Sequence, residues 1–327
     1  MLTVENLSVT FATQRGPLRA VDNVGFSLAP GRTLAVVGES GCGKSVTSLA
    51  IMGLLAEIAR TEGRVVFEGR DLLTLPKAER RKLRGGAMAM IFQEPMTSLN
   101  PAFTAGEQVA EALRVHEGLA PDLALKRAIE MLDRVRIPEP ARRAAAYPHQ
   151  LSGGMRQRVM IAMALACKPR LLIADEPTTA LDVTVQAQIL ALLETLKRET
   201  GTAILLVTHD LGVVADYADD VVVMYAGRVA EAAPAQALFV RPEHPYTIGL
   251  LGAAPRFSAP GGKLANIAGT VPDLAAPPPG CRFAPRCPFV TPRCDTTPPL
   301  AAGVHQVACW NAPLDAAAGR LCSNSPM

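Results

Sequence analysis

Residues 38–45, GESGCGKS, have the G-x-x-x-x-G-K-S spacing of a phosphate-binding loop. Glycines at these positions let backbone N–H groups turn toward phosphate oxygens, and the following helix adds the positive end of its dipole. In such loops the lysine, here Lys44, reaches the β- and γ-phosphates of a nucleotide, and the hydroxyl, here Ser45, ligates Mg²⁺. The apolar RTLAVVG before the motif and the helical VTSLAIMGLL after it supply the required context. An accidental glycine-rich turn is therefore a poor alternative.

Two adjacent carboxylates, Asp175 and Glu176, end the apolar stretch LLIADE. Asp175 is placed to hold Mg²⁺, often through water, and Glu176 is placed to polarise an attacking water. The alternative is a helix N-cap of the kind that follows many strands. A phosphate loop in the same chain makes that alternative the weaker one.

Two further polar residues end apolar stretches. His209 closes AILLVTH, and Gln93 follows MIF in MIFQEP. In a doubly wound sheet the carboxyl ends of the strands face the nucleotide crevice. His209 can donate to the γ-phosphate or orient water, and Gln93 can reach Mg²⁺ or the water. Either residue alone is an ordinary polar strand end, so the prediction depends on the order of the motifs.

A second glycine-rich helix start lies at QLSGGMRQR, where Ser152, Gly153 and Gly154 open a helical pattern. A serine hydroxyl and exposed N–H groups at a helix N-terminus form an anion site, although an ordinary N-cap has the same residues. Residues 38–45 already account for one bound nucleotide. We therefore expect the second loop to hold the γ-phosphate of a nucleotide bound to another subunit, so that ATP joins two chains and hydrolysis releases them.

The elements that position these loops alternate between short apolar stretches and helical patterns, which predicts a mainly parallel sheet covered by helices. The strand pattern disappears between about 94 and 150. AGEQVAEALRVHEG and DLALKRAIEMLDRV have apolar residues at helical spacing there, which indicates a helical insertion. From about residue 256 the sequence is dense in Pro and Cys and predicts a small non-regular module.

The bulk properties fit a globular protein. Of 327 residues, 49% are apolar and 19% charged, and the net charge of +3 is too small to predict a nucleic-acid surface. The basic run ERRKLRGG is interpreted as a solvated helix face. We find no signal-peptide pattern and no apolar run near the roughly 18–20 residues that span a bilayer. The expected location is cytoplasmic.

Five of the seven cysteines lie in the last fifth of the chain. Four of them have five, six and fourteen intervening residues, a set that can hold Zn²⁺ or an iron–sulfur cluster. The paired C-x-x-C knuckles common in structural zinc sites are absent, and free cysteines in a Pro-rich tail remain the alternative. These four are Cys281, Cys287, Cys294 and Cys309. Cys322 is interpreted as a bystander, and Cys42 as a small residue filling the phosphate loop.

The order of the motifs resembles the ATPase subunit of ABC transporters over roughly residues 1–235. The resemblance implies a Walker B aspartate at Asp175, a catalytic glutamate at Glu176, a Q-loop glutamine at Gln93 and a switch histidine at His209. Met155 departs from the glutamine that commonly follows the signature glycines. The residues that would bind ATP and Mg²⁺ are Phe11 (stacked on adenine), Gly38, Glu39, Ser40, Gly41, Cys42, Gly43, Lys44, Ser45, Val46, Gln93, Asp175, the signature residues Ser152, Gly153 and Gly154, and Asp182 in the D-loop, with Ser45, Gln93 and Asp175 as the Mg²⁺ ligands.

The resemblance also implies an α/β P-loop NTPase fold of the ABC type over residues 1–255. Its helical subdomain, at about 94–165, would carry the membrane subunits, with Gln93 at its hinge. Residues 256–327 would form the small Cys/Pro-rich module. RPEHPYTIGLL, IAGTVPDL and this module resemble the ATPase subunits of oligopeptide/dipeptide importers.

That family resemblance implies several partners: a paralogous or identical ATPase subunit, two transmembrane permease subunits and an extracytoplasmic solute-binding protein. It places the chain at the cytoplasmic face of the inner (plasma) membrane, as a peripheral subunit. Solutes in the family include peptides, nickel complexes and glycosides. Because the cysteine module of relatives is associated with a [4Fe-4S] cluster, we favour iron over zinc.

Two other classes of function are less well supported. ABC ATPases that act on DNA ends carry long heptad insertions, and ribosomal ones carry two cassettes, whereas the insertion here is short and has no heptads. The cysteine tail could be a nucleic-acid-binding zinc module through Arg282, Arg286 and Arg293, but it is short and Pro-rich. We therefore expect an ATPase that powers the import of dipeptides or oligopeptides, with a nickel complex or a glycoside as the alternative solute, and that binds no nucleic acid.

Overall fold

The computed structural model describes residues 1–14, 16–93, 98–178, 183–257 and 266–314. The chain divides into two compact units, each of them discontinuous in sequence. The first unit contains Met1–Ser27, Thr33–Leu73 and Val207–Met327, and the second contains Leu28–Arg32 and Thr74–Leu206.

Strands of the first unit form two groups. The strands are β1 (Leu2–Thr13), β2 (Gly16–Leu28), β3 (Thr33–Val37), β4 (Ala59–Phe67), β5 (Arg70–Asp71), β9 (Asp220–Tyr225), β10 (Arg228–Pro234) and β11 (Gln306–Val307). One group has the order β2-β1-β4-β5, with β1–β4 and β4–β5 antiparallel. The other has the order β11-β10-β9-β3. There β3 and β9 are parallel, while β9–β10 and β10–β11 are antiparallel.

Helices of the first unit are short. They are α1 (Lys44–Met52), α9 (Leu211–Tyr217), α10 (Ala235–Val240), α11 (Pro245–Ala253) and the 3₁₀ turns η2 (Pro255–Phe257), η3 (Ala284–Arg286) and η4 (Pro292–Asp295). Gly53 takes the left-handed conformation, with φ 66°, and its N–H closes the last turn of α1. The helix therefore ends three residues before the predicted pattern does.

The core of the first unit joins residues that are far apart in sequence. Val37 of β3, Tyr225 of β9 and Tyr246 of α11 are buried in one apolar cluster with Phe283. The Phe283 ring centroid lies 5.1 Å from that of Tyr225 and 5.4 Å from that of Tyr246. Residues 266–314, here called the C-terminal segment, are thus anchored by an aromatic side chain as well as by the pairing of β11 with β10.

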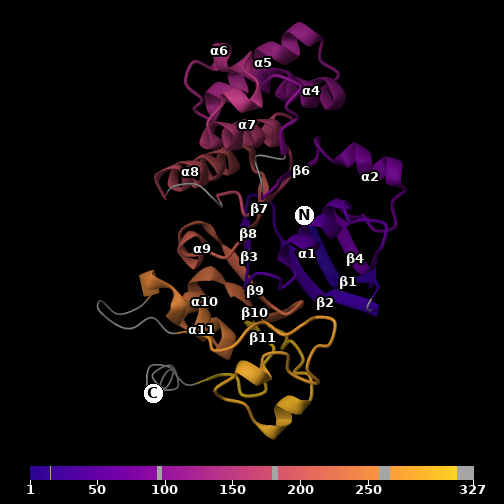
Figure 1. The fold of residues 1–327 in the computed structure, drawn as a ribbon, viewed down its shortest axis with the longest axis vertical. Helices are drawn as coiled ribbons and strands as arrows, with labels where there is room; N and C mark the ends of the chain where they lie inside the picture. The colour runs from indigo at the N-terminus through magenta and orange to yellow at the C-terminus, as the bar shows by residue number, and fades with distance from the viewer. Residues whose placement is uncertain (15, 94–97, 179–182, 258–265, 315–327) are drawn as a thin grey trace. The chain divides into compact units, whose positions relative to one another are not determined.

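Strands and helices of the second unit follow one another along the chain. They are α2 (Lys77–Leu83), β6 (Met88–Ile91), α4 (Ala105–Glu117), α5 (Pro121–Arg134), α6 (Pro140–Ala144), η1 (Pro148–Gln150), α7 (Gly153–Leu165), β7 (Leu171–Asp175), α8 (Val183–Thr200) and β8 (Ala203–Thr208). The strands have the order β8-β7-β6, with β6 and β7 parallel, and every residue of them is buried. Figure 1 shows α4, α5, α6 and α7 gathered together.

Local sequence explains the helix ends in this unit. Thr104 and Glu107 form a capping box at the start of α4, and Gly118 closes its end with φ 68°. Ser152 caps α7, as its place in the sequence predicts.

The predicted α/β fold is confirmed, including strands β3, β7 and β8 and helices α4, α5 and α7. The β2-β1-β4-β5 sheet is an addition, because its long, polar strands lack the apolar runs on which the prediction depended. The boundary at residue 255 and the helical subdomain at about 94–165 remain predictions. Among the described residues, no helix is long and apolar enough to cross a bilayer.

Candidate nucleotide-binding site

The glycines of residues 38–45 lie against backbone. A Cβ on Gly38 would be 2.2 Å from the Met224 carbonyl oxygen, and one on Gly43 would be 2.6 Å from that of Ala20. Their φ angles, 151° for Gly38 and 98° for Gly43, are also positive. Only glycine fits at these two positions, so the loop is held tightly against the first unit.

Lys44 is buried and faces its own loop. Its Nζ donates to the carbonyl oxygens of Gly38 at 2.7 Å and Glu39 at 3.1 Å. Lys44 is also the first residue of α1, and no side chain caps this end of the helix. A helix N-terminus without a side-chain cap, beside a lysine, is a favourable place for phosphate oxygens. Cys42 is fully buried next to Gly38 and fills a small space, as predicted.

Glu39 connects the loop to the C-terminal part of the first unit. Its backbone N–H donates to the Tyr246 hydroxyl at 2.8 Å, and its carboxylate accepts two bonds from Arg286, at 2.7 and 3.1 Å. Burial raises the pKa of Tyr246, so its hydroxyl stays protonated. Neither contact with the loop was predictable from the sequence, because Tyr246 and Arg286 are 207 and 247 positions away from Glu39.

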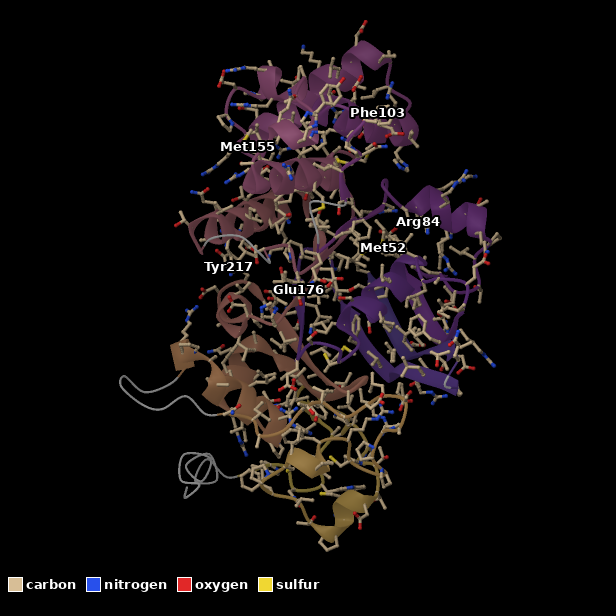
Figure 2. All side chains as sticks on the ribbon, viewed as in Figure 1. Met52, Arg84, Phe103, Met155, Glu176 and Tyr217 are labelled. Carbon is tan, nitrogen blue, oxygen red and sulfur yellow. The ribbon has the colours of Figure 1, made fainter. Side chains whose placement is uncertain are left out.

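Asp175 and Glu176 lie at the end of β7, where Figure 2 labels Glu176. Asp175 is buried, while Glu176 is partly exposed and has φ 46°, an uncommon conformation for a residue other than glycine. The Gln93 Nε2 donates to Glu176 Oε2 at 3.1 Å. In the β6–β7 register Ile91 pairs with Ala174, so Gln93 and Glu176, each two positions after this pair, meet. The structure thus brings two predicted catalytic residues together.

Ser152 and its two glycines form the first turn of α7, and Met155 of that turn is labelled in Figure 2. The Ser152 Oγ accepts from the Met155 N–H at 3.3 Å. Ser152 and Gly153 are exposed. Later in α7, the buried Gln157 donates its side-chain amide to the Pro177 carbonyl, next to Glu176. The N-terminus of α7 is therefore accessible. The same helix is hydrogen-bonded to the residue that follows Glu176, within the same unit.

The remaining predicted nucleotide contacts have the following positions. Phe11 is partly exposed near the end of β1 and faces Ala59 of β4. His209 is exposed directly after β8, and the next residue, Asp210, caps α9 by accepting from the Gly212 N–H at 2.8 Å. Asp182 lies outside the described residues.

The four predicted metal ligands lie in the C-terminal segment, with Cys294 buried and the others partly buried. Burial is the main reason that the pKa of Cys287 is raised to about 12. The neighbouring thiols of Cys309, Cys281 and Cys294 act in the same direction. Burial likewise raises the pKa of Cys281 and of Cys309. The Cys287 and Cys309 sulfurs each accept a backbone N–H two residues ahead, at 3.4 Å, as metal-bound thiolates often do.

The donor chemistry of these cysteines therefore suits a soft metal centre. Within the described ranges, however, no three His, Cys, Asp or Glu side chains are arranged as a ligand set. Their use as metal ligands stays a prediction.

This fold and these loops define an ABC-type ATPase. The dimeric ABC transporter cassette MJ0796 is similar in structure, with a TM-score of 0.66 and 32% identity, over 72% of this chain and 99% of that chain. The same cassette in a post-hydrolysis state, bound to ADP and Pi, gives 0.66 and 31%. The sequence model of the ABC transporter family matches residues 21–179.

Comparison with sequence relatives identifies a more specific family within the ABC ATPases. The model of the oligopeptide/dipeptide transporter C-terminal region matches residues 230–294. The chain is 52% identical to the dipeptide transport ATP-binding protein DppD of Bacillus subtilis, over 95% of this chain and 94% of that protein. It is 54% identical to the oligopeptide transport ATP-binding protein OppD of Salmonella typhimurium, over 92% and 90%. The chain belongs to the ABC transporter ATP-binding proteins that carry this C-terminal region.

Proposed function

We propose that this chain is the ATP-hydrolysing subunit of an importer for dipeptides or oligopeptides. The observation that carries the proposal is the similarity to peptide transport ATP-binding proteins over nine-tenths of the chain or more, including the C-terminal region. A likeness limited to the ATPase cassette would support only the chemistry of ATP hydrolysis and not the solute class.

The phosphate loop binds the nucleotide in this proposal. The backbone amides of residues 38–46 and the Lys44 ammonium hold the phosphates, and Phe11 stacks on adenine. The buried Lys44 supports this role, because its ammonium lies against the loop carbonyls and needs no large movement to meet an anion at the α1 N-terminus. Bound Mg²⁺ would neutralise charge that develops on the phosphates, with Ser45, Asp175 and Gln93 as its ligands.

Glu176 is the general base, and it polarises the attacking water through a carboxylate oxygen. Gln93 supports this role because its amide donates to that carboxylate and orients it. His209 would donate to the γ-phosphate. Its exposure directly after β8 leaves the ring accessible for this contact.

The second loop, Ser152 to Gly154, serves a nucleotide held by another ATPase subunit, with Asp182 as part of the same dimer contact. Its exposed, serine-capped helix start supports this role, because the loop is accessible to a partner. The other ATPase subunit is a paralogue, with a second copy of this chain as the alternative. Two permease subunits and a solute-binding protein complete the importer, and the chain works at the cytoplasmic face of the membrane.

The four cysteines Cys281, Cys287, Cys294 and Cys309 hold a [4Fe-4S] cluster in this proposal, with Zn²⁺ as the alternative. The N–H···S bonds to the Cys287 and Cys309 sulfurs support the assignment. Iron and sulfide analysis of the anaerobically purified chain, together with its visible absorbance, tests it. A content of zinc alone would replace the cluster, and a content of neither would remove the metal.

The solute class is tested by the ATPase rate of the complex reconstituted with its membrane subunits, partner ATPase and solute-binding protein. The rate is compared without solute, with mixed short peptides and with chelated nickel. Stimulation by peptides is the expected result. Stimulation by a non-peptide solute only would leave the assignment as an importer ATPase in place and would overturn the assignment of peptides as the solute.

A further inference from the structure

Arg286, in the C-terminal segment, uses every N–H of its guanidinium. Nε donates to the Ala268 carbonyl at 2.8 Å, and Nη2 donates to the Ile267 carbonyl at 3.2 Å. Nη1 donates to the Tyr225 hydroxyl at 3.3 Å, and the two remaining bonds go to Glu39. Five donors meet five acceptors, so the orientation of this side chain is fully determined.

The pair of Arg286 with Glu39 is largely removed from water. The Arg286 side chain is 6% exposed and that of Glu39 is 27% exposed. Two parallel N–H···O bonds between a guanidinium and a carboxylate fix the mutual geometry of both groups, which a single lysine ammonium cannot do. The hydrogen bond from Arg286 to Glu39 is also the main reason that the pKa of Arg286 is raised.

Glu39 is in turn held on its backbone. Its N–H donates to the Tyr246 hydroxyl, and its carbonyl oxygen accepts from the Lys44 ammonium. The same ammonium also donates to the Gly38 carbonyl oxygen. The orientation of the Gly38–Glu39 segment therefore sets where the Lys44 ammonium lies. A side chain that fixes the Glu39 carboxylate thereby also restrains the lysine that would bind phosphate.

We propose that Arg286 is a positioning residue of the phosphate loop, and that the C-terminal segment thereby sets the affinity of this chain for its own nucleotide. The inference depends on the proposed assignment of residues 38–45 as the nucleotide site. Arg286 immediately precedes Cys287, so a change in the C-terminal segment around this cysteine reaches Glu39 through one side chain. The segment is then a part of the ATP site and not an appendage.

Arg282 provides a matched comparison within the same segment. Its side chain is 9% exposed, its Nη2 lies 2.6 Å from Asp22 Oδ2, and it also donates to the Ala226 carbonyl. It therefore also attaches the C-terminal segment to earlier parts of the first unit, through Asp22 and Ala226. In the part of the chain that the structure describes, its hydrogen-bond partners lie outside residues 38–45. Loss of Arg282 reports on loosening of the segment alone, whereas loss of Arg286 reports on the contact with Glu39.

The test is the affinity of the full-length chain for a fluorescent ATP analogue, measured for Arg286→Lys, Glu39→Gln, their double variant and Arg282→Lys. We expect Arg286→Lys and Glu39→Gln to weaken binding roughly tenfold, a usual size for coupling between sites. The double variant should be no weaker than the weaker single variant, because both changes break one contact. Arg282→Lys should stay within about twofold of the unchanged chain.

A second readout separates positioning from loss of folded protein. In the assembled transporter, Arg286→Lys should raise the KM for ATP with kcat nearly retained, since a smaller folded fraction would lower kcat and leave KM unchanged. If Arg286→Lys does not fold, Glu39→Gln decides alone. Unchanged affinity in both variants, or equal losses in Arg282→Lys and Arg286→Lys, would overturn the proposal. Lys44→Ala in the same assay tests the site itself, and its unchanged affinity would overturn the assignment of residues 38–45 instead.

Discussion

The Gln93 side-chain amide donates a hydrogen bond to the Glu176 carboxylate, with 3.1 Å between Nε2 and Oε2. Both residues follow buried, parallel strands that are in register at Ile91 and Ala174. Glu176 takes a positive φ of 46° here, which costs on the order of 1 kcal/mol or more for a side chain of this kind. The fold retains this conformation at the position where the base of the proposed reaction would be.

Glu176→Gln tests that role. The amide keeps the size of the side chain but cannot accept a proton, so we expect turnover to fall by roughly 10²–10⁴-fold while nucleotide affinity is retained. The checks are steady-state ATPase rate in the assembled transporter and nucleotide binding. Glu130→Gln, on the exposed surface of α5, is the control for loss of one negative charge. Near-normal turnover would remove Glu176 from the role of base.

Lys44→Ala tests the phosphate loop. Removal of the ammonium should lower nucleotide affinity by tenfold or more, since a charge-assisted contact in a partly buried site is worth about 1.5–3 kcal/mol. Equilibrium binding of the fluorescent analogue measures the change. Lys126→Ala, an exposed lysine of α5, removes the same charge and should bind normally. Equal affinities in the two variants would contradict the assignment.

Motifs of short range were predictable from the sequence. GESGCGKS needs a strand before it and a helix after it, and β3 and α1 occupy those places. LLIAD forms strand β7, and all five of its residues are buried. A short apolar run of this kind is typical of a strand in a parallel sheet. The capped start of α7 was likewise local, since Ser152 and the Met155 N–H are three residues apart.

Contacts of long range were not predictable. Glu39 and Arg286 are 247 positions apart, and neither has a periodic pattern or motif that points to the other. The same holds for Tyr246, which belongs to a stretch that marks the family but gives no sign of its contact with the loop. Such pairs depend on how strands and turns pack, which composition and spacing do not determine.

Ser152→Ala tests the second loop. The change removes the N-cap of α7 at a cost of about 1 kcal/mol, and it should reduce hydrolysis in the assembled transporter without weakening nucleotide binding by the isolated chain. Thr104→Ala is a matched control, because it removes the N-cap of α4 at a similar cost and is not among the residues proposed to bind nucleotide. If Ser152→Ala abolishes binding by the isolated chain, the two-subunit site is wrong.

The buried His244 should make the free energy of unfolding depend on pH. The ring is buried, which lowers its pKa from the usual 6.5 to about 4. Its Nδ1 accepts the Tyr246 N–H at 3.0 Å and caps α11, while the neighbouring Glu231 carboxylate contacts its backbone N–H. The ring therefore stays neutral in the folded chain at pH values where the unfolded chain binds a proton.

The unfolded chain thus takes up a proton first as pH falls, so the free energy of unfolding decreases between pH 6.5 and about 4. From pH 7.5 to 5 this loss is about 2 kcal/mol, at about 1.4 kcal/mol for each pKa unit. His244→Asn keeps a capping oxygen but does not titrate in this range, so the variant should not show that loss. Urea unfolding of both chains at the two pH values measures the difference. Parallel pH dependences would mean that the ring is protonated in the folded state and that its burial does not hold it neutral.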